Sequence, residues 1–277
     1  MIKNILVPTD FSKCSVNAIK VAAQLTKKLN ATLHLLHVIE TPVVAYDAGM
    51  VDFESLPQAI FMKELAEENL KTLLKEDFLL GISVESKIEY NAFFARINQY
   101  VQKHEVGLIV LGSHGARGLN EIVLGSNAEH VVRYSICPVL TIKQGYSDFD
   151  VKNILIASDF NNEVDEMFKG FKQFTSVFNA KLHLLKVNTP LNFETTPQSY
   201  TKMQKFAERN KLQNYSLSIY NDHTEEDGII NFADDINADL LLIGTHGRTG
   251  FAHLIKGSIT EDILNHSTRA VLSIKLK

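Results

Sequence analysis

The 277-residue chain has few of the residues that mark specialised protein classes. It has two cysteines, Cys14 and Cys137, and no tryptophan. So few cysteines exclude a disulfide-built fold, and their surroundings lack a CxxC pair or a neighbouring histidine. We therefore expect neither thiol to have a nucleophilic or redox role, and we expect a reducing compartment, the cytoplasm.

Long apolar runs and an excess of one charge are also lacking. The longest apolar stretches, such as 108–111 and 240–243, have about four residues, whereas a membrane span needs roughly 20. The first residues, MIKNILVPTDFS, do not follow the pattern of a secretory signal. Lys and Arg number 28 against 32 Asp and Glu, a net charge of −4. We expect no membrane and no nucleic-acid partner, and the 45% hydrophobic content excludes wholesale disorder.

An internal repeat is the most informative feature that is present. Residues 3–6 (KNIL) recur as 152–155, and residues 30–38 (NATLHLLHV) recur as 179–187 (NAKLHLLKV), both at an offset of 149. Further on, 108–115 (LIVLGSHG) recurs as 240–247 (LLLIGTHG) at an offset of 132. The repeat predicts two copies of one domain, 1–145 and 150–277, joined closely by a turn-rich linker at 144–150. The difference of 17 residues predicts an inserted loop or lid at 41–57 of the first copy.

Apolar runs and helical segments alternate within one copy. In the first copy we expect strands at about 2–8, 31–39, 82–90, 107–112 and 138–143, nearly continuous in apolar residues and so buried on both faces. Between the first two, Ala18, Ala22, Leu25 and Leu29 have the spacing of an amphipathic helix. This order predicts an α/β fold, a doubly wound parallel sheet with helices on both faces. Ligands of such folds bind beyond the carboxyl ends of the strands.

A glycine motif follows the fourth strand in each copy, with the spacing G-x2-G-x9-G-S. It comprises Gly112, Gly115, Gly125 and Ser126 in the first copy and Gly244, Gly247, Gly257 and Ser258 in the second. Glycines let backbone amides approach an anion, and a helix N-terminus adds positive potential, so the motif favours phosphate binding. A plain turn is the alternative. The motif lacks the lysine of a P-loop, which favours binding over phosphoryl transfer.

Serine and glutamate three residues apart predict a capping box at the start of the helix that follows each glycine motif. The pairs are Ser126 with Glu129 and Ser258 with Glu261.

Several polar residues have two possible roles. Asp10 and Asp159 follow the first strand of each copy, where a carboxylate can bind a ribose or help to hold Mg²⁺, or simply cap a turn. Arg117 and Arg248 lie just beyond the second glycine and either clamp a terminal phosphate or point to solvent.

The histidines do not indicate a metal site. His34 and His37 are three residues apart on a strand, so they point to opposite faces and cannot share a metal ion; we expect structural roles for both. His114 and His246 fall within the glycine loops. Phe93, Phe94, Ile97 and Tyr100 have helical spacing and are expected to pack in the core or between the domains.

Together these motifs resemble those of the universal stress protein family. The matching segments are VPTDFS at 7–12, LHLLHV at 33–38, GSHGARG at 112–118 and GTHGRTG at 244–250, together with the glycine spacing. The resemblance covers essentially the whole chain. It implies two fused domains, each a five-stranded parallel sheet in the order 3-2-1-4-5, paired through their last strands as an intramolecular pseudo-dimer.

In that family the intact glycine motif marks the ATP-binding branch. The resemblance implies a cytoplasmic stress-response or signalling protein that binds ATP, ADP or AMP, with Mg²⁺, and has no strong catalytic activity. A slow ATP hydrolase or phosphotransferase using the same site, with Asp10 holding metal and water, stays open, as does a scaffold that binds no nucleotide. We expect an unidentified protein partner, and either a monomeric pseudo-dimer or a homodimer.

The resemblance also assigns nucleotide-binding residues, with no catalytic residue and no metal ligand. In the first copy they are Pro8, Thr9, Asp10, Val38, Gly112, His114, Gly115, Arg117, Gly125, Ser126 and Asn127. In the second they are Asp159, Val187, Gly244, His246, Gly247, Arg248, Gly257, Ser258 and Ile259. Two positions depart from the family pattern: Ala157 replaces the proline, and Asn127 stands where a small apolar residue is usual.

Overall fold

The computed structural model of the protein describes residues 2–40, 56–90, 92–113, 125–143, 146, 148–161, 163–246 and 259–276. Within these ranges, every helix is too short or too polar to cross a lipid bilayer.

The first half contains five strands and four α-helices among the described residues. The strands are β1 (Asn4–Pro8), β2 (Thr32–Ile39), β3 (Ser83–Tyr90), β4 (Leu108–Gly112) and β5 (Val139–Ile142). The helices are α1 (Lys13–Leu29), α3 (Pro57–Leu73), α4 (Phe93–Lys103) and α5 (Ser126–Tyr134), with a short 3-10 helix η2 (Asp77–Leu79). Each strand predicted from the sequence is confirmed to within two residues at either end. The predicted burial on both faces is wrong for β3, whose residues are exposed or half-buried because it is the outermost strand of the sheet.

The second half repeats this order. Its strands are β6 (Asn153–Ala157), β7 (Lys181–Asn188), β8 (Tyr215–Asn221), β9 (Leu240–His246) and β10 (Ala270–Leu276). Its helices are α6 (Glu163–Thr175), α7 (Thr196–Asn210), α8 (Glu225–Asp235) and α9 (Ile259–His266).

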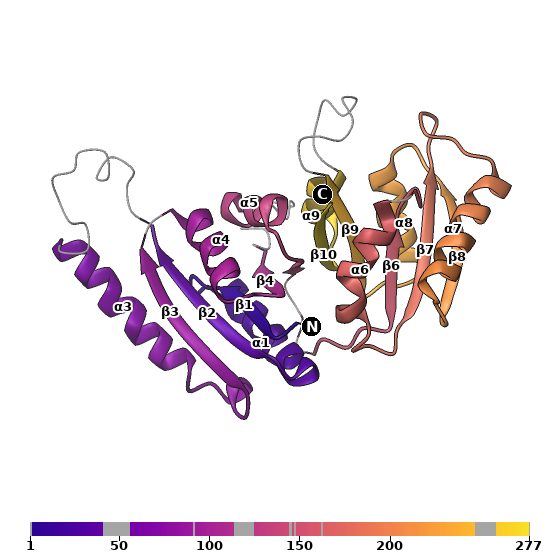
Figure 1. Ribbon diagram of the computed structural model, residues 1–277. Helices are drawn as coiled ribbons and strands as arrows, with labels where there is room; N and C mark the ends of the chain where they lie inside the picture. The colour runs from indigo at the N-terminus through magenta and orange to yellow at the C-terminus, as the bar shows by residue number, and fades with distance from the viewer. Residues whose placement is uncertain are drawn as a thin grey trace.

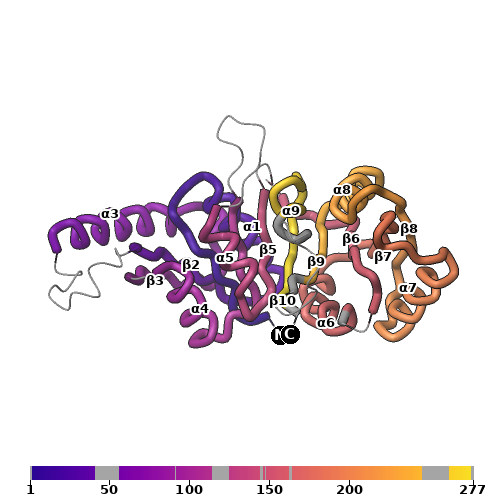
Figure 2. Tube along the Cα trace, turned by 90° about the horizontal axis from the view of Figure 1, so that it is seen from above, coloured from indigo at the N-terminus to yellow at the C-terminus, as the bar shows by residue number. Residues whose placement is uncertain are grey.

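All ten strands form one sheet in the order β3-β2-β1-β4-β5-β10-β9-β6-β7-β8 (Figure 1). Within each half the strands are parallel and ordered 3-2-1-4-5, which confirms the predicted doubly wound fold. The halves join where β5 pairs with β10 in the antiparallel direction, with Leu140 opposite Leu272. Figure 2 shows this pair at the centre of the molecule, with one half on each side. The strand order reverses between β1 and β4, and again between β6 and β9, which is where a ligand of this fold is expected.

Helices cover both faces of the sheet, because successive residues of each strand point to opposite sides. Ile5 and Val7 of β1 belong to a core cluster on one face that also contains residues of α1, α3, α6 and α7, whereas Leu6 belongs to the cluster on the other face, with residues of α4, α5, α8 and α9. Ala18 and Leu25 of α1 are fully buried, as the helical spacing predicts.

The segment between the halves is packed rather than loose. The Tyr146 hydroxyl accepts a 2.8 Å hydrogen bond from the Ala270 N–H at the start of β10. The Phe149 side chain is 1% exposed, and its ring lies edge-on to Tyr146 and Phe178. The Phe149 N–H also donates to Gln24 of α1 at 2.9 Å, so the segment contacts both halves. Together with the pairing of β5 and β10, these contacts confirm the prediction that the two halves form a packed pair.

The predicted capping box at Ser126 is wrong. Gly125 is the N-cap of α5, and Ser126 is its first helical residue, with no side-chain capping hydrogen bond. The backbone of Gly125 is extended and its carbonyl accepts from the Glu129 N–H at 2.9 Å, so the helix begins one residue earlier than a serine cap requires. Ser258 lies outside the described residues. So does the predicted lid, apart from Leu56, which is the N-cap of α3, and Pro57, which begins that helix.

Candidate functional site

The turn after β1 is held by its own polar groups. The Thr9 side chain is 5% exposed; its hydroxyl accepts from the Phe11 N–H and donates to Ser15 Oγ, each at 3.1 Å. Phe11 has a left-handed backbone, with φ of 62°. His37 Nδ1 lies 2.8 Å from the Thr9 carbonyl. The hydroxyl of Thr9, one of the predicted nucleotide contacts, therefore forms hydrogen bonds within the turn itself.

Asp10 places an ionised carboxylate at the carboxyl end of β1. Its side chain is exposed, and Oδ1 accepts from the Ser12 N–H at 3.0 Å. Partial burial raises the pKa of Asp10, but hydrogen bonds from Ser12 and Ser15 outweigh it, so the pKa lies below its usual value. Ser12 caps α1 by accepting from the Ser15 N–H at 3.3 Å. Asp10 thus caps the turn after β1, as the alternative interpretation of the sequence predicted, and its carboxylate remains charged at the edge of the sheet.

The first glycine of the motif is required by packing. Gly112 is the last residue of β4, and a Cβ atom there would lie 2.2 Å from the Cys14 carbonyl oxygen of α1. The next residue, Ser113, is 1% exposed and donates its hydroxyl to the Ile142 carbonyl at 3.2 Å. The strand end is therefore clamped between α1 and β5, close to the Asp10 turn.

The second end of the motif lies at the same edge of the sheet. Gly125 and Ser126 begin α5, and the Asn127 amide donates to Glu40 Oε1, just after β2, at 2.9 Å. The side chain of Asn127, which replaces the small apolar residue usual in the family, thus forms a hydrogen bond with Glu40. His114, Gly115 and Arg117 lie outside the described residues.

The second half forms the same turn with a different carboxylate environment. Phe160 has φ of 55°, and its N–H donates to Ser158 Oγ at 3.1 Å. The Asn161 backbone donates to Asp159 Oδ1 at 3.2 Å, and its side-chain amide donates to Oδ2. Both carboxylate oxygens of Asp159 therefore accept hydrogen bonds from Asn161. The residue at the equivalent position of the first half is Ser12.

The second glycine motif begins inside a strand rather than after it. β9 continues through Gly244 to His246, two residues farther than β4, because β10 pairs with it as far as Leu276. β5 ends at Ile142, where the chain leaves for the second half. Gly247, Arg248, Gly257 and Ser258 lie outside the described residues, and Ile259 is the first residue of α9.

The two valines assigned to adenine are mostly core residues. Val38 is 9% exposed and Val187 is 5% exposed. A Cβ atom at Gly228 of α8 would lie 2.5 Å from Val187 Cγ1, so this helix covers the valine closely. Each valine can offer a ligand only a small edge.

Two hollows lie near the carboxyl ends of the strands in the second half. One, of about 380 Å³, is lined by Asn188, Thr189, Pro190, Phe193, Asn221, Asp222 and His223. The other, of about 420 Å³, is lined by Phe160, Asn161, Lys202, Lys205 and Arg209. Two of these cations have acidic partners: Lys202 pairs with Glu194, and Arg209 pairs with Asp165 at 2.7 Å.

His34 and His37 point to opposite faces of β2, as predicted. His34 is 3% exposed and contacts the Tyr100 hydroxyl at 3.1 Å and Asn4 Oδ1 at 3.3 Å, whereas the His37 ring packs on Phe11. Burial lowers the pKa of His34 and, together with nearby carboxylates, raises the pKa of Tyr100 to about 12, so both are neutral near pH 7. His183 repeats the contact of His34, with Nε2 at 3.1 Å from Asn153 Oδ1.

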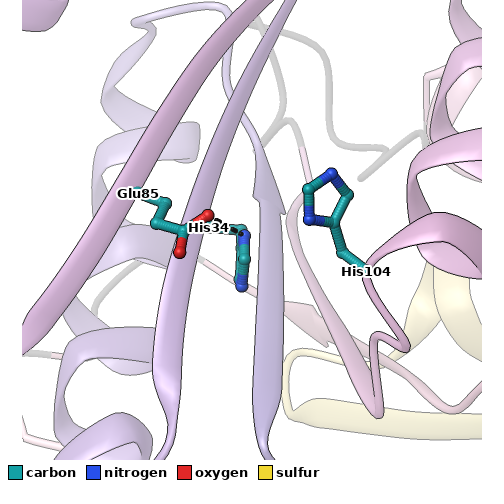
Figure 3. Close-up of side chains that lie close together, drawn as sticks. All are labelled: His34, Glu85 and His104. Atoms are coloured by element: carbon teal, nitrogen blue, oxygen red, sulfur yellow. Dashed lines mark ion pairs between the residues drawn. The ribbon is translucent and has the colours of Figure 1, made fainter.

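Sequence reasoning missed a cluster around His34. A Glu85 oxygen lies 3.5 Å from His34 Nδ1, and His104 completes a group of three potential ligands (Figure 3). The register of β2 against β3 brings Glu85 beside His34, and this register cannot be predicted from the sequence of either strand alone.

Comparisons with known proteins agree with this architecture. The sequence model of the Universal stress protein family matches residues 1–143 and 150–275. Universal stress protein MJ0531 of Methanocaldococcus jannaschii is 32% identical over 143 residues, 51% of this chain and 82% of its own. Universal stress protein Slr1230 of Synechocystis is 23% identical over 293 residues, covering 99% of this chain and all of its own.

A solved structure shows the same fold over the full length. The crystal structure of a universal stress protein from Archaeoglobus fulgidus matches with a TM-score of 0.78 at 23% identity, covering 99% of each chain. Both halves of the sequence match one family, and their sheets have one strand order. The chain therefore belongs to the universal stress protein family, as a tandem of two of its domains.

Proposed function

We propose that this tandem protein binds adenine nucleotide, ATP or its hydrolysis products together with Mg²⁺, and acts as a cytoplasmic stress-response or signalling protein. One observation carries the proposal: the charged carboxylate of Asp10 lies at the point where the strand order reverses, beside the strand that leads into the glycine motif. This is where ligands of doubly wound sheets bind.

In this proposal the loop amides around Gly115 and the first turn of α5, at Gly125 and Ser126, bind the phosphates. Asp10 accepts hydrogen bonds from the ribose or from water bound to Mg²⁺. The exposed edge of Val38 contacts adenine, and Arg117 faces the terminal phosphate. The equivalent residues of the second half form a second site.

We infer that the first site binds more tightly. Both carboxylate oxygens of Asp159 already accept hydrogen bonds from Asn161, so a ligand must displace that amide before it reaches them. In the first half Asp10 also accepts hydrogen bonds, from Ser12 and Ser15, but Ser12 has no side-chain amide and its hydroxyl also caps α1.

We also propose that the two domains comprise residues 1–145 and 150–277. The assembly state follows from the way in which they pair. β5 and β10 pair with each other inside the chain, so the strand edges that two domains would use to associate are already occupied. We propose a monomeric pseudo-dimer; a homodimer would require other surfaces.

Thermal unfolding with and without Mg-ATP tests the proposal, with Gly115→Val and Gly247→Val as matched variants that place a branched side chain in each phosphate loop. At 100 times its Kd a ligand adds about 2.7 kcal/mol, which raises Tm by roughly 5–10 °C. We expect the shift to be lost in Gly115→Val and kept in Gly247→Val. The absence of a shift at millimolar ATP, with an equally flat calorimetric titration, would refute nucleotide binding and favour the scaffold.

The same complex decides between binder and enzyme. ATP recovered intact and in stoichiometric amount after incubation supports the binder. Turnover well above that of Gly115→Val would show the slow hydrolase instead.

A further inference from the structure

Three potential metal ligands converge at the amino ends of the strands in the first half. His34 and Glu85 are directly opposed in the parallel register of β2 and β3, so their side chains leave the same face of the sheet. His104 is the C-cap residue of α4, one turn after Tyr100, and its ring stacks on that tyrosine at 4.1 Å between centroids. One ligand atom from each of the three residues lies within 4.8 Å of the other two (Figure 3). The cluster lies at the opposite end of the strands from Asp10.

The hydrogen bonds around His34 fix which of its nitrogen atoms faces the cluster. The Asn4 Nδ2 atom donates to the His104 carbonyl at 2.7 Å, so Asn4 Oδ1 is the atom that faces His34 Nε2. Nε2 must therefore carry the proton, because Oδ1 can only accept. This leaves the lone pair on Nδ1, the atom 3.5 Å from Glu85. Metal-binding histidines are commonly oriented in this way, with the other N–H donated to an oxygen.

The second half provides an internal comparison. His183 and Asn153 keep the hydrogen-bonded pair, which is the structural part shared by both copies. Ser216 takes the place of Glu85 opposite the histidine, and the offset of 132 aligns His104 with Ile236. Among the residues that the structure describes, only the first half thus combines the oriented histidine with a carboxylate and a second imidazole.

We propose that His34 Nδ1, a Glu85 carboxylate oxygen and a His104 ring nitrogen form a Zn²⁺ site, with water as the fourth ligand. Two imidazoles and one carboxylate are a ligand set that zinc prefers, and neighbouring ligands of a tetrahedral zinc at about 2.0–2.1 Å lie roughly 3.4 Å apart. The separation of His34 from Glu85 already matches this value. Metal binding replaces the Tyr100 hydroxyl as the partner of the Nδ1 lone pair.

Such a site would fasten the edge strand β3 to β2 and to the end of α4. β3 is the outermost strand of the first half, and Glu85 is 60% exposed. The metal is therefore expected to stabilise this edge without involving the nucleotide-binding edge of the sheet.

Calorimetric titration of the full-length, chelator-treated protein with Zn²⁺ tests the site, and Co²⁺ supplies a second readout through the visible absorption of tetrahedral cobalt. Glu85→Ser and His104→Ile each install the residue found in the second half. Both positions are exposed or half-buried, and circular dichroism without metal confirms that the variants fold. The exposed His223→Ala variant controls for adventitious histidine binding.

We expect one Zn²⁺ per chain, and binding at least about 10–100-fold weaker in Glu85→Ser and in His104→Ile, because removing even a residue that only orients a ligand causes such a loss. His223→Ala should bind as the wild type does. The proposal is overturned if no saturable binding is found, or if either ligand variant that folds binds Zn²⁺ as tightly as the wild type.

Discussion

Replacing Gly112 with alanine separates the packing role of the glycine motif from any role in ligand binding. The new Cβ atom would lie 2.2 Å from the Cys14 carbonyl oxygen and 2.5 Å from its carbonyl carbon. Carbon–oxygen contacts normally measure about 3.3 Å or more, so β4 and α1 must separate by about 1 Å. Overpacking of this kind costs about 1–3 kcal/mol, and the clash is between backbone atoms that no rotamer change can move. We expect a loss of about 2–3 kcal/mol without nucleotide.

Gly170→Ala is the matched control. Its Cβ atom would approach Ile274 Cδ1 at 2.1 Å, but that atom is the tip of a side chain and can turn away. Gly170 also lies within α6, where alanine is favoured over glycine by about 1 kcal/mol. We expect this variant to stay within about 1 kcal/mol of the wild type in equilibrium guanidinium unfolding. Equal stabilities of the two variants would refute the packing argument for Gly112.

Three further predictions concern buried polar groups. Burial lowers the pKa of Lys143 from 10.5 to about 8, so between these pH values the unfolded chain binds more protons and the stability of the wild type rises with pH. Replacing the buried charge in Lys143→Met should raise the unfolding free energy by about 1–3 kcal/mol at pH 7. This gain should shrink as the pH is raised from 8 to 10.5. Tyr146→Phe leaves the Ala270 N–H without its partner and should lower the unfolding free energy by about 1–3 kcal/mol, whereas the exposed Tyr200→Phe should change it by less than about 0.5. Burial raises the pKa of Cys137 to about 11, so a thiol reagent at about pH 7.5 should leave it unmodified until denaturant is added. Because Cys14 is only half-buried, the labelled residue is identified by peptide mapping, and rapid labelling of Cys137 in the native protein would contradict its burial.

Local sequence patterns predicted the secondary structure and the sides that residues face. The nearly continuous apolar runs located β1, β2, β4 and β5, because strands buried on both faces have no polar side to interrupt them. The edge strand β3 has the mixed sequence SVESKIEY, and its residues are exposed or half-buried. The three-residue spacing of His34 and His37 placed them on opposite faces of β2, and this is confirmed by their contacts with Tyr100 and Phe11. Such properties depend on residues that are close in the chain.

The glycine motif was recognised from its spacing, but its local geometry was only partly predictable. A Ser-x-x-Glu pattern suggested that Ser126 caps α5, whereas the extended Gly125 does so. The length of β9 depended on whether β10 continues beside it, and the need for glycine at 112 came from the approach of α1. In each case the deciding partner lies outside the motif.

The sequence by itself determined the duplication, the strands, the buried helix faces and the family. Only the tertiary structure decided that Glu85 lies opposite His34 and that the Cys14 carbonyl excludes a side chain at position 112. It also showed that the side-chain amide of Asn161 donates a hydrogen bond to Asp159. Periodicity is a property of neighbouring residues, so it can be read from a single segment. Strand register and the distance of closest approach are set by the packing of segments far apart in the chain, where the whole core fixes their positions.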